Sequence, residues 1–182
     1  GYVRSEGAGA VILKPLSVAQ AAGDTVYAVI RGTATNNDGR TNGLIAPNRQ
    51  AQAALLQAAY RQAGLAPESV HYIEAHGTGT VLGDPIEIEG LRQAFEPDTR
   101  AAGSCSIGSA KSNIGHLEAA AGVAGLSKVL LQMKHGQLAP SLHAAQLNPN
   151  IAFDKTPFVV NRSLTPWAPR RADGERLPRI AG

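Results

Sequence analysis

Two short segments of the sequence combine residue types that proton transfer and hydrogen bonding to a reacting group require. The first, residues 74–80, reads Glu-Ala-His-Gly-Thr-Gly-Thr and contains His76. The second, residues 111–118, reads Lys-Ser-Asn-Ile-Gly-His-Leu-Glu and contains His116. An imidazole is the side chain that most readily donates or accepts a proton near neutral pH. Because glycines flank both histidines, the two segments predict one pocket that contains two imidazoles.

The residues that follow the first histidine suit a loop that contacts a ligand. Gly77 and Gly79 allow backbone angles that other residues avoid, and they also allow a ligand to approach the backbone closely. Thr78 and Thr80 supply hydroxyl groups at alternate positions. Taken alone, the loop is equally compatible with a ligand site and with an ordinary turn.

A dinucleotide-binding turn is an alternative interpretation of the same loop. A strand, then Gly77, Gly79 and Gly83, then a helix resembles the phosphate-binding fingerprint. However, Gly83 falls one position late for that fingerprint. We also expect Asp84 to cap the next helix, which would place a negative charge where a pyrophosphate needs backbone amides. The sequence therefore favours another kind of site.

Charges in the second segment need partners because we expect them at the start of a buried helix. Burial of a lone charge is costly, so we predict that Lys111 and Glu118 approach and neutralise each other. The remaining histidines lack such surroundings and are interpreted as surface or capping residues. Cys105 stands between two serines without a nearby cation, which indicates a small buried side chain rather than a nucleophile. No spacing of Cys and His predicts a metal site.

Alternating strands and helices are predicted to position both segments. Apolar, β-rich runs predict buried strands at residues 8–14 and 26–31, and further strands at 70–75 and 158–160. Helical spacing, with capping residues included, predicts helices at residues 17–22, 48–64, 84–97 and 117–135. The last of these begins with Ala and Gly and is predicted to be buried. Together these elements predict an α/β fold whose sheet is covered by helices.

Composition narrows the class of protein. The chain has 182 residues, of which 43% are hydrophobic and 17% charged, and these values indicate one packed domain. A diffuse net charge of +3 predicts no nucleic-acid partner. The longest run of small apolar residues is far shorter than the ~20 residues that span a bilayer, so we expect no membrane partner. A single cysteine and the absence of a leader-like segment predict a cytoplasmic location.

The two histidine segments resemble motifs of a known protein family. Residues 74–80 and 111–122 are similar to the two histidine motifs of the β-ketoacyl synthase (ketosynthase) domain, a member of the thiolase superfamily. The resemblance continues through residues 1–16, 37–44, 46–48 and 135–149, and so covers essentially the whole chain. The Asn-Asp-Gly-Arg loop and the Leu-Glu-Ala-Ala-Ala-Gly run after His116 are more similar to modular polyketide synthases than to discrete bacterial fatty-acid enzymes.

The resemblance implies a thiolase-like layered α/β fold and an acyltransferase activity. The implied reaction is decarboxylative Claisen condensation of an acyl-enzyme thioester with a malonyl-type extender, in polyketide or type I fatty acid biosynthesis. By resemblance, His76 and His116 are the catalytic histidines, which donate hydrogen bonds to the thioester oxygen of the extender. Lys111 and Glu118 match a charged pair that supports the second histidine.

The resemblance also implies how substrates reach the site. They arrive on the 4'-phosphopantetheine arm of an acyl carrier protein, and Thr78 and Thr80 match positions that hydrogen-bond this arm. No tightly bound cofactor is implied. The implied partners are the carrier protein, the remainder of the ketosynthase domain and a second copy in a homodimer, within a multifunctional enzyme.

The expected nucleophile is not among residues 1–182. We expect residues 1–182 to be the C-terminal portion of a ketosynthase domain, truncated at both ends, with the nucleophilic cysteine upstream and a glycine-rich loop downstream. The chain alone is then expected to be inactive. An alternative is a non-elongating relative that binds or transfers acyl chains or scaffolds a dimer, and the identity of the upstream residue would decide between the two.

Overall fold

A parallel sheet forms the centre of the chain. The computed structural model describes residues 1–41, 43, 46–95, 103–169, 171–172 and 175–182. Three parallel strands lie in the order β1 (Tyr72–Glu74), β2 (Cys105–Gly108) and β4 (Phe158–Val160). Residues 180–182 run beside β1 on its other edge, where the Glu74 N–H donates to the Gly182 carbonyl at 2.9 Å. The predicted strands at 70–75 and 158–160 are confirmed.

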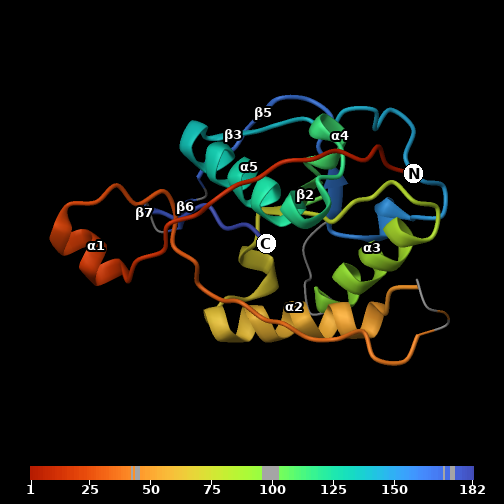
Figure 1. Cartoon of the computed structure of the whole chain (residues 1–182), viewed down its shortest axis with the longest axis horizontal. Helices are drawn as coiled ribbons and strands as arrows, with labels where there is room; N and C mark the ends of the chain where they lie inside the picture. Colours follow the sequence, from red (N-terminus) through yellow and green to blue (C-terminus); the bar gives the residue numbers. More distant parts are fainter. Residues whose placement is uncertain (42, 44–45, 96–102, 170, 173–174) are drawn as a thin grey trace.

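Helices cover both faces of this sheet, as Figure 1 shows. The helices are α1 (Leu16–Ala22), α2 (Arg49–Ala63), α3 (Gly83–Ala94), α4 (Lys111–Ile114) and α5 (Ala121–His135), with single 3₁₀ turns at Pro67–Ser69, Glu118–Ala120 and Phe153–Lys155. Two small antiparallel pairs join β3 (Gln137–Leu138) to β5 (Thr165–Pro166) and β6 (Arg171–Ala172) to β7 (Glu175–Arg176). Ile73 packs in the core with residues of α2 and α3, whereas the adjacent Tyr72 packs with Leu138 and Trp167 and with residues of α5. The predicted covered sheet is therefore confirmed.

Local sequence signals account for the boundaries of α2. The side-chain oxygen of Asn48 accepts from the backbone N–H groups of Gln50 and Ala51, which satisfies donors at the start of the helix. Gly64 ends the helix with a φ of 63°, a left-handed angle that costs glycine little. Both caps agree with the prediction.

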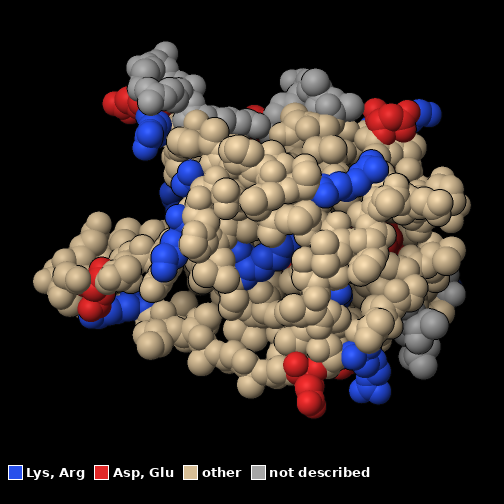
Figure 2. All heavy atoms as spheres, turned by 90° about the horizontal axis from the view of Figure 1, so that it is seen from above, with Lys and Arg blue, Asp and Glu red and all other residues tan. Residues whose placement is uncertain are grey.

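The prediction of buried strands at residues 8–14 and 26–31 is wrong. Within the described chain neither run belongs to a strand ladder, and Ile12 is 98% exposed while Tyr27 is 61% exposed. The reason is that the described sheet offers no strand beside either run, so the apolar pattern has no layer to pack into. Only α1 and the adjoining parts of the two runs stand out from the body (Figures 1 and 2), because Gly9 lies against α5 and Arg31 contacts the end of α2. The segment of residues 8–31 is referred to below as the α1 arm.

Two helix starts also differ from the prediction. The helix predicted from residue 117 begins at Ala121, because Gly115 and Glu118 adopt positive φ angles of 77° and 53° that interrupt helical geometry. Its N-terminal half is mostly half-buried rather than buried. The helix predicted from Asp84 begins at Gly83, and its predicted end at Pro97 lies outside the described residues. In the described part of the chain no helix is both long enough and apolar enough to cross a membrane.

Candidate active site

The two histidine segments meet at one edge of the sheet. His76 follows the carboxyl end of β1, and the segment that contains His116 follows the carboxyl end of the neighbouring parallel strand β2. Ligand sites of α/β sheets gather at such strand ends. The ring centroids of His76 and His116 lie 5.4 Å apart with the rings nearly perpendicular. A cavity of about 330 Å³ opens beside His76, Lys111 and the start of α5. The two imidazoles therefore lie next to each other, but of the two only His76 lines this cavity.

Two carboxylates from α3 hold the His76 loop. One carboxylate oxygen of Glu87 accepts from the backbone N–H of His76 at 2.6 Å, and the other accepts from the backbone N–H of Gly77 at 2.9 Å. Asp84 accepts from the backbone N–H of Gly79 at 3.0 Å and so stabilises the loop. Contrary to the prediction, it does not cap the helix. Gly77 has a φ of 50°, and a Cβ there would lie 2.8 Å from the Cβ of Ser109. Glycine is therefore required at this position for both conformational and steric reasons.

The surroundings of His76 favour its neutral form. Partial burial is the largest cause that lowers the pKa of His76, and the positive charge of Lys111 and the neighbouring His116 lower it further. Asp84 acts in the opposite direction with a smaller effect. Because the ordinary pKa of histidine is about 6.5, a lowered value leaves the His76 imidazole uncharged at pH 7.

His116 is buried and its ring is fixed by the backbone. Its Nδ1 accepts a hydrogen bond from the Glu118 N–H at 3.0 Å, so in the neutral ring the proton resides on Nε2. The backbone N–H of His116 donates to the Val3 carbonyl at 2.8 Å, and the Ser5 N–H donates to the His116 carbonyl at 2.9 Å. The ring of Tyr2 lies against the imidazole at a centroid distance of 4.6 Å. Residues near the start of the chain therefore position the second histidine.

The predicted contact between Lys111 and Glu118 is not formed. Glu118 instead makes an ion pair with Arg4 at 3.2 Å, and both side chains are largely solvated. Glu118 turns away because its left-handed backbone aims its N–H at His116 and its side chain outward. Lys111 is partly buried, which is the main cause that lowers its pKa, and the negative charges of Glu87 and Glu74 partly offset this effect.

The two threonines lie side by side on the His76 loop. Their hydroxyl oxygens are 3.1 Å apart, and Thr80 also accepts from the Gly83 N–H at 3.0 Å at the start of α3. Each hydroxyl has one O–H to donate. One O–H is used between the two threonines, which leaves the other for a ligand or water.

Sequence reasoning missed a buried group of three polar side chains beside the histidines. Lys128 on α5 donates to a carboxylate oxygen of Glu74 at 2.8 Å and to the Tyr72 hydroxyl at 2.7 Å, and the Lys128 and Glu74 side chains are only 13% and 12% exposed. The role of Glu87 was also missed. Its position three residues after Asp84, on the same helix face, was a usable signal. No comparable signal marks Lys128 because its partners lie 54 and 56 residues away.

No cluster suited to a metal ion accompanies the histidines. Among the described residues, no group of three or more His, Cys, Asp or Glu side chains could hold one.

Comparisons with known proteins extend this description of fold and site. The structure superposes on an oxazolomycin ketosynthase domain, OzmH KS7 from Streptomyces albus JA3453, with a TM-score of 0.96, 53% identity and coverage of 100% of this chain and 32% of that one. A ketosynthase from module 6 of the bacillaene synthase of Bacillus subtilis 168 matches 92% of this chain and 29% of its own, with a TM-score of 0.85 and 47% identity. The fold therefore matches part of a ketosynthase domain with a thiolase-like architecture.

Family assignment follows from the sequence comparisons. The family model for the C-terminal domain of β-ketoacyl synthase matches residues 27–145. The chain is 54% identical over its whole length to polyketide synthase PksM of Bacillus subtilis and 58% identical to polyketide synthase ThaG of Burkholderia thailandensis. It spans only 4% and 3% of the lengths of these two curated relatives. The chain belongs to the β-ketoacyl synthase family and corresponds to its C-terminal domain.

Proposed function

We propose that this chain provides the two-histidine part of a ketosynthase that extends an acyl chain by decarboxylative condensation with a malonyl-type unit. The observation that carries the proposal is the pair of imidazoles, 5.4 Å apart, at the carboxyl ends of two parallel strands. The similarity to polyketide synthases along the whole chain supports the same reaction class, an acyl transfer with carbon–carbon bond formation.

In this proposal the two imidazoles donate hydrogen bonds to the charge that the reaction develops. When carbon dioxide leaves the malonyl group, negative charge moves to the thioester oxygen, and donors aimed at that oxygen lower the barrier. His116 has its Nε2–H available because its Nδ1 accepts from Glu118. His76 supplies a second N–H from a ring kept neutral by burial and by Lys111. In this proposal Lys111 acts on the charge of His76, and Glu118 acts through its backbone on the tautomer of His116.

The nucleophile is proposed to come from outside residues 1–182. Cys105 is 0% exposed and lies in β2 within the hydrophobic core, where no thioester could reach it. A nucleophilic thiolate needs an accessible and electropositive setting. The burial of Cys105 supports the proposal that the cysteine carrying the acyl chain belongs to the remainder of the ketosynthase domain.

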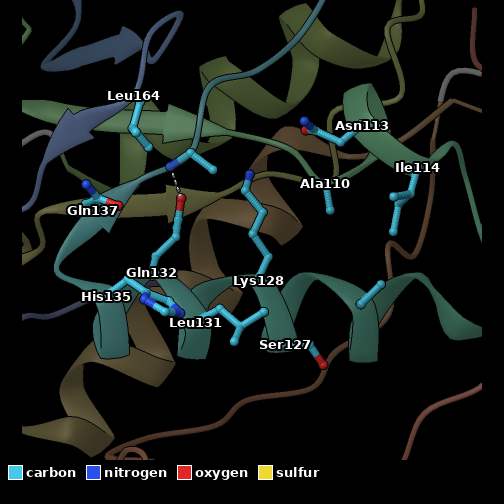
Figure 3. Close-up of a pocket in the computed structure, with 12 residues that line it drawn as sticks. Ala110, Asn113, Ile114, Ser127, Lys128, Leu131, Gln132, His135, Gln137 and Leu164 are labelled. Atoms are coloured by element: carbon cyan, nitrogen blue, oxygen red, sulfur yellow. Dashed lines mark hydrogen bonds between the residues drawn. The ribbon is translucent and has the colours of Figure 1, made fainter.

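Exposed apolar surface supports the proposal that these residues pack against another portion of the ketosynthase domain. A groove of about 450 Å³ runs along α5 and is lined by Ile114, Leu131 and Leu164, which are 51%, 54% and 61% exposed (Figure 3). The α1 arm exposes further apolar residues. Contiguous exposed apolar surface of this kind indicates a protein interface. We propose that residues 1–182 are the C-terminal portion of the domain and that its other portion, with a second copy in a homodimer, covers this surface.

The remaining proposed partner is an acyl carrier protein. Its phosphopantetheine arm is placed along Thr78 and Thr80, where one O–H is left to donate. Anchoring the arm beside the histidines converts a diffusing encounter into a positioned one.

The test uses a complete ketosynthase domain that contains this chain. Incubation with an acyl thioester and malonyl-carrier protein should release carbon dioxide and form a 3-oxoacyl product. Acyl loading without decarboxylation would contradict the proposal and favour a non-elongating relative. The chain alone, assayed in parallel, should give no product and no acylation at Cys105.

A further inference from the structure

Glu74 uses its two carboxylate oxygens in different directions. One oxygen, Oε2, accepts from Lys128 at 2.8 Å and from the Tyr72 hydroxyl at 2.7 Å. The other, Oε1, accepts from the backbone N–H of Ala110 at 2.6 Å. Ala110 directly precedes α4, the helix that leads to His116. Glu74 itself lies two residues before His76. A single carboxylate therefore joins the two histidine segments.

The surrounding structure is shaped to hold this carboxylate. In Figure 3, Lys128 rises from α5 in the direction of the strands, so its stem crosses the layer between helix and sheet. Burial is the main cause that raises the pKa of Tyr72, and Glu74 raises it further, so the phenol stays protonated and donates. A Cβ at Gly125 would lie 3.1 Å from Cγ of Glu74, and a Cβ at Gly108 would lie 2.9 Å from the Tyr72 hydroxyl. Both glycines leave room for the group.

A buried ion pair of this kind is weak evidence for a contribution to stability. Removing two charges from water costs about as much as their attraction returns. A pair that only supported the fold would not need its second oxygen aimed at a backbone N–H of the other histidine segment. The arrangement instead suits an element that fixes relative position, because its three contacts come from β1, α5 and the start of α4.

We propose that Glu74, held by Lys128 and Tyr72, is a positioning residue that sets the distance between His76 and His116 by bridging their two segments through Ala110. The inference rests on the proposed function, since it deepens the account of the same site. The bridge requires that the Glu74 side chain be long enough to accept a hydrogen bond from the backbone N–H of Ala110. The charge of Glu74 serves to anchor the carboxylate on Lys128.

Two substitutions break the bridge from opposite ends. Glu74→Asp keeps the charge opposite Lys128 but is one methylene too short to reach Ala110 as well. Ala110→Pro removes the N–H and leaves every charge in place, and the φ of −59° at Ala110 is one that proline adopts.

A double variant keeps the bridge but removes the ion pair. In Glu74→Gln/Lys128→Met, the amide oxygen still reaches Ala110 and no buried charge is left alone. Lys134→Met, at an exposed position on α5, is the matched control.

The main measurement is malonyl decarboxylation by the complete ketosynthase domain, with kcat and KM determined separately. Misplacement of a reacting group by about 1 Å can cost a hundredfold in rate, so we expect Glu74→Asp and Ala110→Pro to lower kcat by about ten- to hundredfold while KM changes by less than about twofold. Acyl loading of the nucleophile should be unchanged, because it does not use the bridge. The double variant should lose less activity than Glu74→Asp. The opposite order, or near-normal kcat in both bridge variants, would overturn the proposal.

A second measurement separates failure of the bridge from failure of the proposed function. Hydrogen exchange of residues 110–116 should be faster in Glu74→Asp than in Lys134→Met, whether or not the wild-type domain decarboxylates malonyl thioesters. Unchanged exchange would overturn the bridge even in an active enzyme. An inactive wild type with the expected exchange would instead overturn the proposed function alone. Ala110→Pro decides the outcome if Glu74→Asp does not fold.

Discussion

The two histidine segments are held by different parts of the chain. The His76 segment is held mainly by Glu87 and Asp84 of α3, the next helix along the chain, and Glu87 lies 11 positions after His76. His116 is held by backbone contacts with Val3 and Ser5, which lie more than one hundred positions away. The first segment therefore depends on local structure, whereas the second depends on correct assembly of distant segments. Mutations should affect the two in different ways.

The largest expected effect comes from removing either imidazole. Loss of one preorganised donor typically costs about a hundredfold or more in rate. His76→Ala and His116→Ala should therefore each lower decarboxylation by at least about this factor in the complete domain, while acyl loading survives. Parallel assays of carbon dioxide release and acyl loading measure this. Near-normal decarboxylation in either variant would show that the two segments do not act as a pair.

A smaller effect is expected from weakening the local support of His76. Glu87→Gln leaves one acceptor oxygen for the two N–H groups of His76 and Gly77. An unsatisfied backbone donor costs about 1–3 kcal/mol, so the thermal midpoint should fall and decarboxylation should decrease less than in His76→Ala. Glu89→Gln, at a more exposed position on the same helix, is the control. A larger loss in the control would contradict a special role for Glu87.

The charge of Lys111 should be visible in the pH dependence. Because Lys111 lowers the pKa of His76, Lys111→Met should raise that pKa toward its ordinary value. Activity needs the neutral ring, so the acidic limb of the pH–rate profile should move to higher pH. The shift should be partial, since burial is the larger cause. A limb that moves to lower pH would show that Lys111 acts on another group.

The smallest effect is expected at Arg4, on the side of the second histidine. Its ion pair with Glu118 is largely solvated, and exposed pairs contribute about 0–1 kcal/mol. Arg4→Ala should therefore leave decarboxylation nearly unchanged at ordinary salt concentrations. A strong loss of kcat would show that this pair, rather than the backbone, keeps Glu118 in its left-handed conformation.

The sequence predicted those parts of the fold that depend on interactions between neighbouring residues. Asn48 and Gly64 marked the ends of α2 because capping involves neighbouring backbone groups. The meeting of His76 and His116 was predicted from their glycine-flanked loops, but strand β2, which positions the second loop, was not predicted. The partner of Glu118 could not be predicted in this way, because Arg4 is distant in sequence and the choice depends on a positive φ. The strands predicted at 8–14 and 26–31 failed because an apolar pattern does not say whether a neighbour is present.

The α1 arm has a practical consequence for handling this polypeptide. Extended, β-rich apolar segments without ladder partners can pair with the same segments of other molecules. Produced without a covering partner, the chain should form soluble oligomers or aggregates whose amount rises with protein concentration. Co-expression with the complementary portion of a ketosynthase should suppress this behaviour, and light scattering would follow it. The exposed apolar residues of the α1 arm would then determine how long the purified protein stays unaggregated in storage.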